Sequence, residues 1–216
     1  MPECERQKDV ERIVSQMARW REHPWAAIED GVVITLDPKN LREPIRKFPN
    51  QPWLRELTNI WMEEPLLVIP KSRQMLTSWL MIWCHLWLAM FHEGAAVFLQ
   101  SDKEEKSNEL VQRAEFIYNH FPPGEIILPK LRQGRATWCS MVWPGLNSFI
   151  KGIAQGADQL RQYSATGVFL DEAAFWEKGR ESFAATKPTV DGGGRVTLVS
   201  SARAGWFRDI VFDMSV

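Results

Sequence analysis

Four short apolar runs, each followed at once by polar residues, recur along the 216-residue chain. They are Leu66–Ile69, Ala95–Leu99, Gly167–Leu170 and Arg195–Val199. Segments with apolar residues at helical spacing lie between them, including one that begins at about Thr77. Buried strands that alternate with helices are typical of a mostly parallel sheet flanked by helices on both faces. The pattern therefore predicts an α/β fold.

The remaining segments predict further elements around this sheet. Helical periodicity is expected over residues 1–30 and again over Trp53–Met62. Several prolines between these segments favour a loop, with at most a short strand at Val32–Leu36. Alternating apolar residues over Thr137–Trp143 predict a strand that pairs with Ser148–Ile153 as a hairpin. After the second apolar run, Ser101 and Glu104 have the spacing of a capping box that opens a helix.

Composition excludes several classes of protein. The net charge of −1 is far from the basic balance of proteins that coat nucleic acid, so DNA contact would need a local patch or an assembly. Three cysteines without a CxxC pair predict neither a disulfide framework nor a zinc site. The apolar segment Trp79–Phe91 is shorter than the roughly 20 residues of a membrane span. We therefore expect a soluble, intracellular protein in which Trp79, Trp83, His85 and Trp87 belong to a buried helix.

Each apolar run is followed by charged or hydroxyl-bearing residues that could bind a ligand or take part in catalysis. The sequences are PKSRQMLTS, QSDKE, DE and SSAR, in chain order. In a parallel α/β sheet, ligands bind beyond the carboxyl ends of the strands. Taken together and in this order, these endings match the layout of a P-loop ATPase with a catalytic glutamate.

The first of these endings departs from the usual phosphate-binding motif GxxxxGK[ST]. It has no glycine, and Leu76 and Thr77 stand where Gly-Lys is expected before Ser78. Lys71 and Arg73 still supply positive charge, and Ser78 supplies a hydroxyl at the start of a helix, where phosphate and Mg²⁺ are commonly held. The alternative is a basic turn that only caps a buried helix.

The third ending places two adjacent carboxylates, Asp171 and Glu172, after a buried strand. Phosphoryl transfer to water requires an acid near Mg²⁺ and a second acid that faces the attacking water as a base. The alternative is that one carboxylate caps the next helix and the other is solvated.

Three segments resemble the N-terminal ATPase part of the large subunits of viral (bacteriophage) DNA-packaging terminases. They are KSRQM at Lys71–Met75, VFLDEAAF at Val168–Phe175, and IAQGADQLRQYSATG just before it. The resemblance extends from about Phe48 to Ser201. It implies a P-loop NTPase fold of the ASCE or RecA-like type.

The resemblance also implies roles for particular residues. Asp171 is similar to the metal-binding acid, with Ser78 as a second metal ligand, and Glu172 to the catalytic glutamate. Gln51 resembles a glutamine that reads adenine in some members. The variant Walker A segment, with its lysine moved forward, comprises Lys71, Ser72, Arg73, Gln74, Met75, Leu76, Thr77 and Ser78. The coupling motif that links hydrolysis to movement comprises Ser200, Ser201 and Ala202.

An arginine that acts on a neighbouring subunit's nucleotide is also implied. Arg161 lies ten residues before Asp171, in the segment that carries this arginine in the family. Arg203, at the end of the fourth run, competes for the same role.

The function that the resemblance implies is an ATPase motor that hydrolyses ATP with Mg²⁺ to move double-stranded DNA into a procapsid. Its partners would be a portal protein, a small terminase subunit and further copies of the chain in a ring, although the isolated chain could be a monomer. Activity would be in the host cell cytoplasm, transiently at the procapsid portal, with no membrane.

Residues 1–47 would form an extension and residues 48–216 the ATPase core, with no room for the family's nuclease domain. A helicase-like translocase and a catalytically inactive nucleotide-binding scaffold are the alternatives.

Overall fold

The structure is a computed structural model and describes residues 3–122, 128–132, 139–156, 160 and 163–213. Its helices are α1 (Glu3–Glu22), α2 (Pro24–Glu29), α3 (Pro52–Glu63), α4 (Thr77–Phe91), α5 (Glu104–Asn119), the 3₁₀ turn η1 (Ala173–Phe175), α7 (Gly179–Ala184), α8 (Lys187–Asp191) and α9 (Trp206–Asp213). Its strands are β1 (Ile34–Leu36), β2 (Ile45–Lys47), β3 (Leu66–Lys71), β4 (Ala96–Ser101), β5 (Ser140–Trp143), β6 (Ser148–Ala154), β7 (Gly167–Asp171) and β8 (Arg195–Ser201).

Six of the strands form one central sheet in the order β3-β8-β7-β4-β6-β5. All neighbouring pairs are parallel except β5 with β6, which form the predicted antiparallel hairpin. The register places Lys71 of β3 opposite Ser201 of β8, and Asp171 of β7 opposite Val199. The predicted mostly parallel α/β sheet is confirmed, and the polar endings of β3, β7 and β8 lie at one edge of it.

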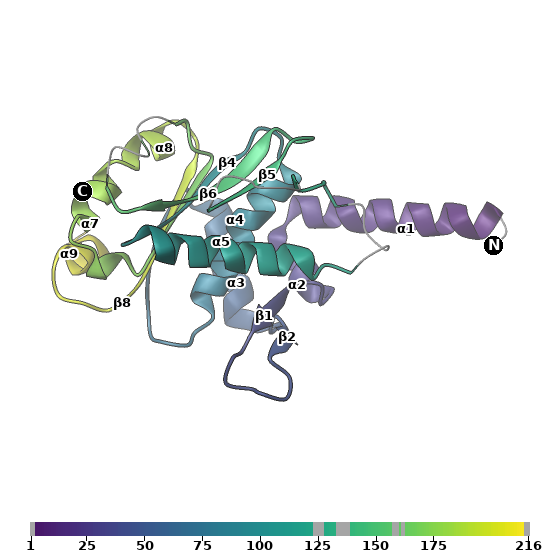
Figure 1. Cartoon of the computed structure of the whole chain (residues 1–216), viewed down its shortest axis with the longest axis horizontal. Helices are drawn as coiled ribbons and strands as arrows, with labels where there is room; N and C mark the ends of the chain where they lie inside the picture. Colours follow the sequence, from purple (N-terminus) through teal and green to yellow (C-terminus); the bar gives the residue numbers. More distant parts are fainter. Residues whose placement is uncertain (1–2, 123–127, 133–138, 157–159, 161–162, 214–216) are drawn as a thin grey trace.

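Both faces of the sheet are buried at its central strands β4, β7 and β8, whereas the edge strand β3 is only partly buried. Phe169 belongs to the hydrophobic cluster that contains α4, whereas its neighbours Val168 and Leu170 belong to a second cluster with Phe207 of α9. Successive strand residues point to opposite faces, so a continuous apolar run needs cover on both sides. Figure 1 shows α7, α8 and α9 gathered at the end of the molecule opposite to α1.

The N-terminal segment packs into the same core as the central sheet. The indole Nε1 of Trp83 donates to the carbonyl of Pro24 at 2.9 Å, and that of Trp87 donates to the carbonyl of Trp20 at 2.6 Å. The first part of α1 extends away from the rest of the chain (Figure 1). The division between an extension and a core at residue 48 stays a prediction.

Two details of the N-terminal segment differ from the sequence-based expectation. The helix expected over residues 1–30 is interrupted at His23, whose Nδ1 accepts from the N–H of Trp25 at 3.1 Å and caps α2 in front of Pro24. The proline-containing loop holds a second strand, β2, which pairs antiparallel with β1. Residues Ile45–Lys47 are all exposed, so no burial pattern signalled this strand.

The expected capping box before α5 is wrong. The N-cap of α5 is Lys103, and no side chain caps the helix. Strand β4 continues to Ser101, whose N–H donates to the Ser107 hydroxyl at 3.0 Å. Because the strand takes up Ser101, its side chain is not available at the start of the helix.

The aromatic stripe on α4 is largely core, as predicted. Trp83, His85 and Trp87 are buried, and the Nδ1 of His85 donates to the carbonyl of Met81 at 2.8 Å. Trp79 is the exception, because it is half-buried and borders a cleft. Among the helices of the described residues, none combines the length and the apolarity needed to span a bilayer.

Candidate functional site

The turn between β3 and α4 takes a left-handed backbone conformation at two residues that are not glycine. The φ angles are 66° at Gln74 and 55° at Leu76. Leu76 is the N-cap of α4 and directly precedes Thr77, so it occupies the place of the second glycine in the usual motif. Residues with a Cβ rarely adopt this conformation, at a cost of about 1–2 kcal/mol each. Leu76 therefore adopts a backbone conformation that glycine would normally provide at this place in the motif.

The N-terminus of α4 is open to a ligand. The first N–H groups of a helix have no intrahelical partner, and no side chain caps α4. The helix dipole adds positive potential at the same place, which favours an anion such as phosphate. Ser78 lies in this first turn.

Ser78 and Asp171 form the first half of the site. The Ser78 hydroxyl donates to Asp171 Oδ1 at 2.7 Å, across 93 residues of sequence. Burial raises the pKa of Asp171, the Ser78 hydrogen bond partly opposes that rise, and the neighbouring Glu172 adds to it. A hydroxyl and a carboxylate are hard oxygen ligands of the kind that Mg²⁺ prefers, with phosphates and waters completing the shell. These two residues fit a magnesium ion bound together with a nucleotide.

A magnesium site of this kind needs few protein ligands. Within the described residues, no group of three or more His, Cys, Asp or Glu could hold a metal ion. Mg²⁺ in phosphoryl-transfer sites usually binds one or two carboxylates together with substrate phosphates, so one hydroxyl and one carboxylate suffice.

Glu172 forms the second half. Its Oε1 accepts from Lys71 Nζ at 2.6 Å, and its Oε2 accepts from the Ser201 N–H at 3.0 Å. Burial raises the pKa of Glu172, but the hydrogen bonds from Lys71 and Ser201 outweigh it, so the pKa lies below its usual value. Glu172 is therefore a carboxylate at neutral pH, as a base for water must be.

The end of β8 connects the site to the next segment of the chain. The Ser200 hydroxyl accepts from the N–H of Ala174 at 3.1 Å and lies 3.4 Å from Glu172 Oε2. Glu172 itself has a left-handed φ of 53° at the start of η1. Ala202, the third residue of the expected coupling motif, is exposed. Ser200 and Ser201 thus contact the carboxylate directly, whereas Ala202 continues the chain away from β8.

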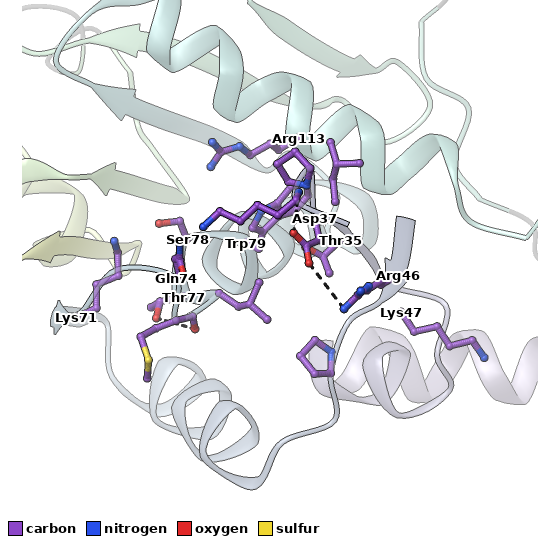
Figure 2. A pocket seen from close by; sticks show the side chains of 16 residues that line it. Thr35, Asp37, Arg46, Lys47, Lys71, Gln74, Thr77, Ser78, Trp79 and Arg113 are labelled. Atoms are coloured by element: carbon purple, nitrogen blue, oxygen red, sulfur yellow. Dashed lines mark hydrogen bonds and ion pairs between the residues drawn. The ribbon is translucent and has the colours of Figure 1, made fainter. Parts of the chain in front are cut away.

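A cleft of about 560 Å³ lies against the turn between β3 and α4. Figure 2 shows Lys71, Gln74, Thr77 and Ser78 on one side of it, and residues of β1, β2 and their connection on the other. The opposite wall contains the side chains of Thr35, Asp37, Lys39, Arg46 and Lys47. A smaller cavity of about 110 Å³ adjoins Asp171 and Glu172 at the end of β7.

Several residues expected at the site lie elsewhere. Ser72 and Arg73 are exposed and do not line the cleft. Gln51 is exposed at the N-cap of α3 and also lies outside the cleft lining. Arg203 lies over the Phe175 ring, with its guanidinium carbon 5.1 Å from the ring centroid. Arg161 lies outside the described residues, so its role stays a prediction.

The structure also adds residues to the site that the sequence did not indicate. Arg113 of α5 lines both the cleft and the smaller cavity. The β1–β2 wall comes from the segment that was expected to be an extension. Neither position follows a strand of the central sheet, so the rule that ligands bind beyond strand ends could not find them.

Comparison with known proteins identifies the fold. No protein-family model and no curated protein matches the sequence. The chain is similar in structure to the bacteriophage HK97 large terminase, with a TM-score of 0.59 and 13% identity over 79% of this chain and 38% of that one. It is also similar to the large terminase of a thermophilic bacteriophage, with a TM-score of 0.50 and 11% identity over 69% of this chain and 36% of that one.

The chain thus spans less than half the length of either of these two terminases. Its α/β fold, with a mostly parallel central sheet as the sequence predicted, is similar to the fold of part of the HK97 large terminase.

Proposed function

We propose that the chain is the ATPase motor of a bacteriophage large terminase, hydrolysing ATP to move double-stranded DNA into a procapsid. The observation that carries the proposal is the pairing of both strand-end carboxylates with the turn between β3 and α4. Asp171 bonds Ser78 and Glu172 bonds Lys71, each within 2.7 Å. An inactive scaffold has no need for two acids held against a phosphate-binding turn.

In this proposal, each residue acts on a defined part of MgATP. The N–H groups at the start of α4 and the ammonium group of Lys71 bind the phosphates. Ser78 and Asp171 hold Mg²⁺, which neutralises charge on the phosphate oxygens. Glu172 accepts a proton from the attacking water, for which Lys71 must first leave it and turn to the phosphate.

Ser200 and Ser201 are placed to couple ATP hydrolysis to a structural change in the rest of the chain. Both contact Glu172, and Ser200 also holds the backbone of η1 through Ala174. A shift of Glu172 during the reaction would therefore move the backbone of η1 and the end of β8. The chain continues from β8 to α9.

The wider assembly is part of the same proposal. With a net charge of −1, one chain offers little non-specific affinity for DNA, so several copies in a ring would share one duplex. A portal protein and a small terminase subunit would be the further partners, and the host cytoplasm the location. Arg161 would act on the nucleotide of the neighbouring copy.

The test is phosphate release from ATP with Mg²⁺ and with a chelator. We expect release only with Mg²⁺, and a loss of about tenfold or more in Ser78→Ala, because the hydroxyl ligand is removed. Ser15→Ala, on the exposed face of α1, is the matched control and should behave like the parent. Binding of nucleotide without any release would favour the inactive scaffold. Unwinding of duplex DNA into single strands would favour the helicase-like alternative.

A further inference from the structure

We propose that Arg113 is a cation, supplied by the same chain, that recognises the terminal phosphate of bound ATP and so distinguishes triphosphate from diphosphate. The inference rests on the proposed function. Arg113 lies in the middle of α5, on an element that carries no recognised motif. It borders both the cleft beside Lys71 and Ser78 and the smaller cavity beside Asp171 and Glu172.

The position of Arg113 coincides with the place that a terminal phosphate must occupy. The inner phosphates would lie on the N-terminus of α4, in the cleft. The attacking water must lie next to Glu172, which borders the smaller cavity. The terminal phosphate has to bridge these two places, and Arg113 is the residue outside the turn that lines both. Figure 2 shows its side chain beside α5 at the edge of the cleft, above Ser78 and Trp79 in this view.

The side chain of Arg113 is positioned by a contact with an aromatic ring. Its guanidinium carbon lies 5.6 Å from the centroid of the Trp79 ring, a cation–π contact that sets its direction. Arg113 is half-buried, and within the described part of the chain it takes part in no hydrogen bond or ion pair. Arg46, the other arginine in the lining of the cleft, differs from it because it pairs with Asp37. The charge of Arg113 opposes the rise that burial causes in the pKa of nearby Asp171, but no ion pair joins these two side chains. The N–H donors of Arg113 are therefore available to an anionic ligand.

The smaller cavity is lined mainly by acidic side chains, so a cation is needed there to offset their negative charge. Its lining includes the carboxylates of Asp102, Glu109, Asp171 and Glu172, against the single ammonium of Lys106, which already pairs with Asp102. Such a cavity repels a phosphate unless positive charge is added. The planar guanidinium of Arg113 presents a fork of N–H donors that suits the oxygens of a terminal phosphate.

The experiment compares two ligands by calorimetry in the presence of Mg²⁺: ADP and the non-hydrolysable β,γ-imido analogue of ATP. Arg113→Gln should weaken binding of the triphosphate analogue by roughly 10- to 100-fold, the range of a charge-assisted hydrogen bond, and binding of ADP much less. Arg180→Gln removes an equal charge from an exposed site on α7 and should change neither affinity. Arg113→Lys keeps the charge without the fork and should fall between the parent and Arg113→Gln.

The outcomes separate this inference from the proposed function. If Arg113→Gln weakens both ligands equally, or weakens neither, the inference is wrong and the ATPase assignment is untouched. If the parent binds neither ligand, both fail. If thermal unfolding shows that Arg113→Gln does not fold, the same two affinities are compared in Arg113→Lys instead. An unchanged ratio of the two affinities in that variant overturns the inference.

Discussion

Lys71 and Glu172 meet across an intervening strand. Lys71 ends β3 and Glu172 follows β7, with β8 between these strands in the sheet, yet their charged atoms lie 2.6 Å apart. The Lys71 side chain is 10% exposed and that of Glu172 is 39% exposed, so the pair lies at the wall of the site and not on open surface. In this structure the Lys71 ammonium group and the Glu172 carboxylate neutralise each other's charge. In the proposed function, a bound nucleotide would draw Lys71 away and so free Glu172 for water.

The first prediction ranks the two cations of the turn. Lys71→Ala should abolish ATP turnover, because Lys71 lines the cleft and is the cation nearest to Glu172. Arg73→Ala should weaken turnover less, because Arg73 is exposed and outside the cleft lining. Steady-state phosphate release measures both variants. A larger loss in Arg73→Ala than in Lys71→Ala would reverse the ranking.

The second prediction separates the roles of the adjacent acids. Asp171→Asn should weaken binding of ATP in the presence of Mg²⁺ by about tenfold or more, because a metal ligand loses its charge. Binding measured with a chelator should change little. The comparison is made by calorimetry with the β,γ-imido analogue. An equal loss with and without Mg²⁺ would assign Asp171 a structural role.

The third prediction concerns the glycine-free turn. Gln74→Val should lower the free energy of unfolding by roughly 1 kcal/mol, because a β-branched residue is more strained than Gln at a φ of 66°. Gln74→Gly should not lower it, because glycine adopts this conformation without strain. Denaturant unfolding measures both. Equal stability of the two variants would show that the turn relaxes away from this conformation.

The fourth prediction is a pH dependence of stability that comes from His85. Burial lowers the pKa of His85 to about 4. In the unfolded chain His85 binds a proton near pH 6.5, so the unfolded state gains a proton that the folded state does not bind. His85 should therefore cost about 2 kcal/mol of stability as the pH falls from 7 to 5.

Urea unfolding at the two pH values measures this effect. His85→Leu should remove most of the difference, whereas His120→Leu, at an exposed position at the end of α5, should retain it. An unchanged pH dependence in His85→Leu would mean that other groups cause it.

The sequence was sufficient for the sheet and for the residues at strand ends. Leu66–Ile69 and Gly167–Leu170 are apolar enough to identify strands locally, although only the second is fully buried, because β3 lies at the edge of the sheet. Their endings carried Lys71, Asp171 and Glu172. The pairing of Lys71 with Glu172 depends on the order of strands in the sheet, which no local pattern contains.

The remaining parts of the site arise from tertiary packing. Arg113 reaches the site because α5 packs beside α4, so that the Arg113 guanidinium lies over the ring of Trp79. Of the β1–β2 wall, β1 lies within the short strand expected at Val32–Leu36, whereas β2 is fully exposed and has no apolar pattern that could have predicted it. The shape of the turn at Leu76 could not be predicted, since a left-handed conformation is normally inferred from glycine.

The central claim is that Glu172 activates water for ATP hydrolysis, and single-turnover phosphate release by Glu172→Gln tests it most directly. The amide keeps the size and most hydrogen bonds of the side chain but cannot act as the base. We predict that the variant binds MgATP at least as well as the parent and that its rate of phosphate release falls by about 100-fold or more. Release at the parental rate, with nucleotide bound, would contradict the account.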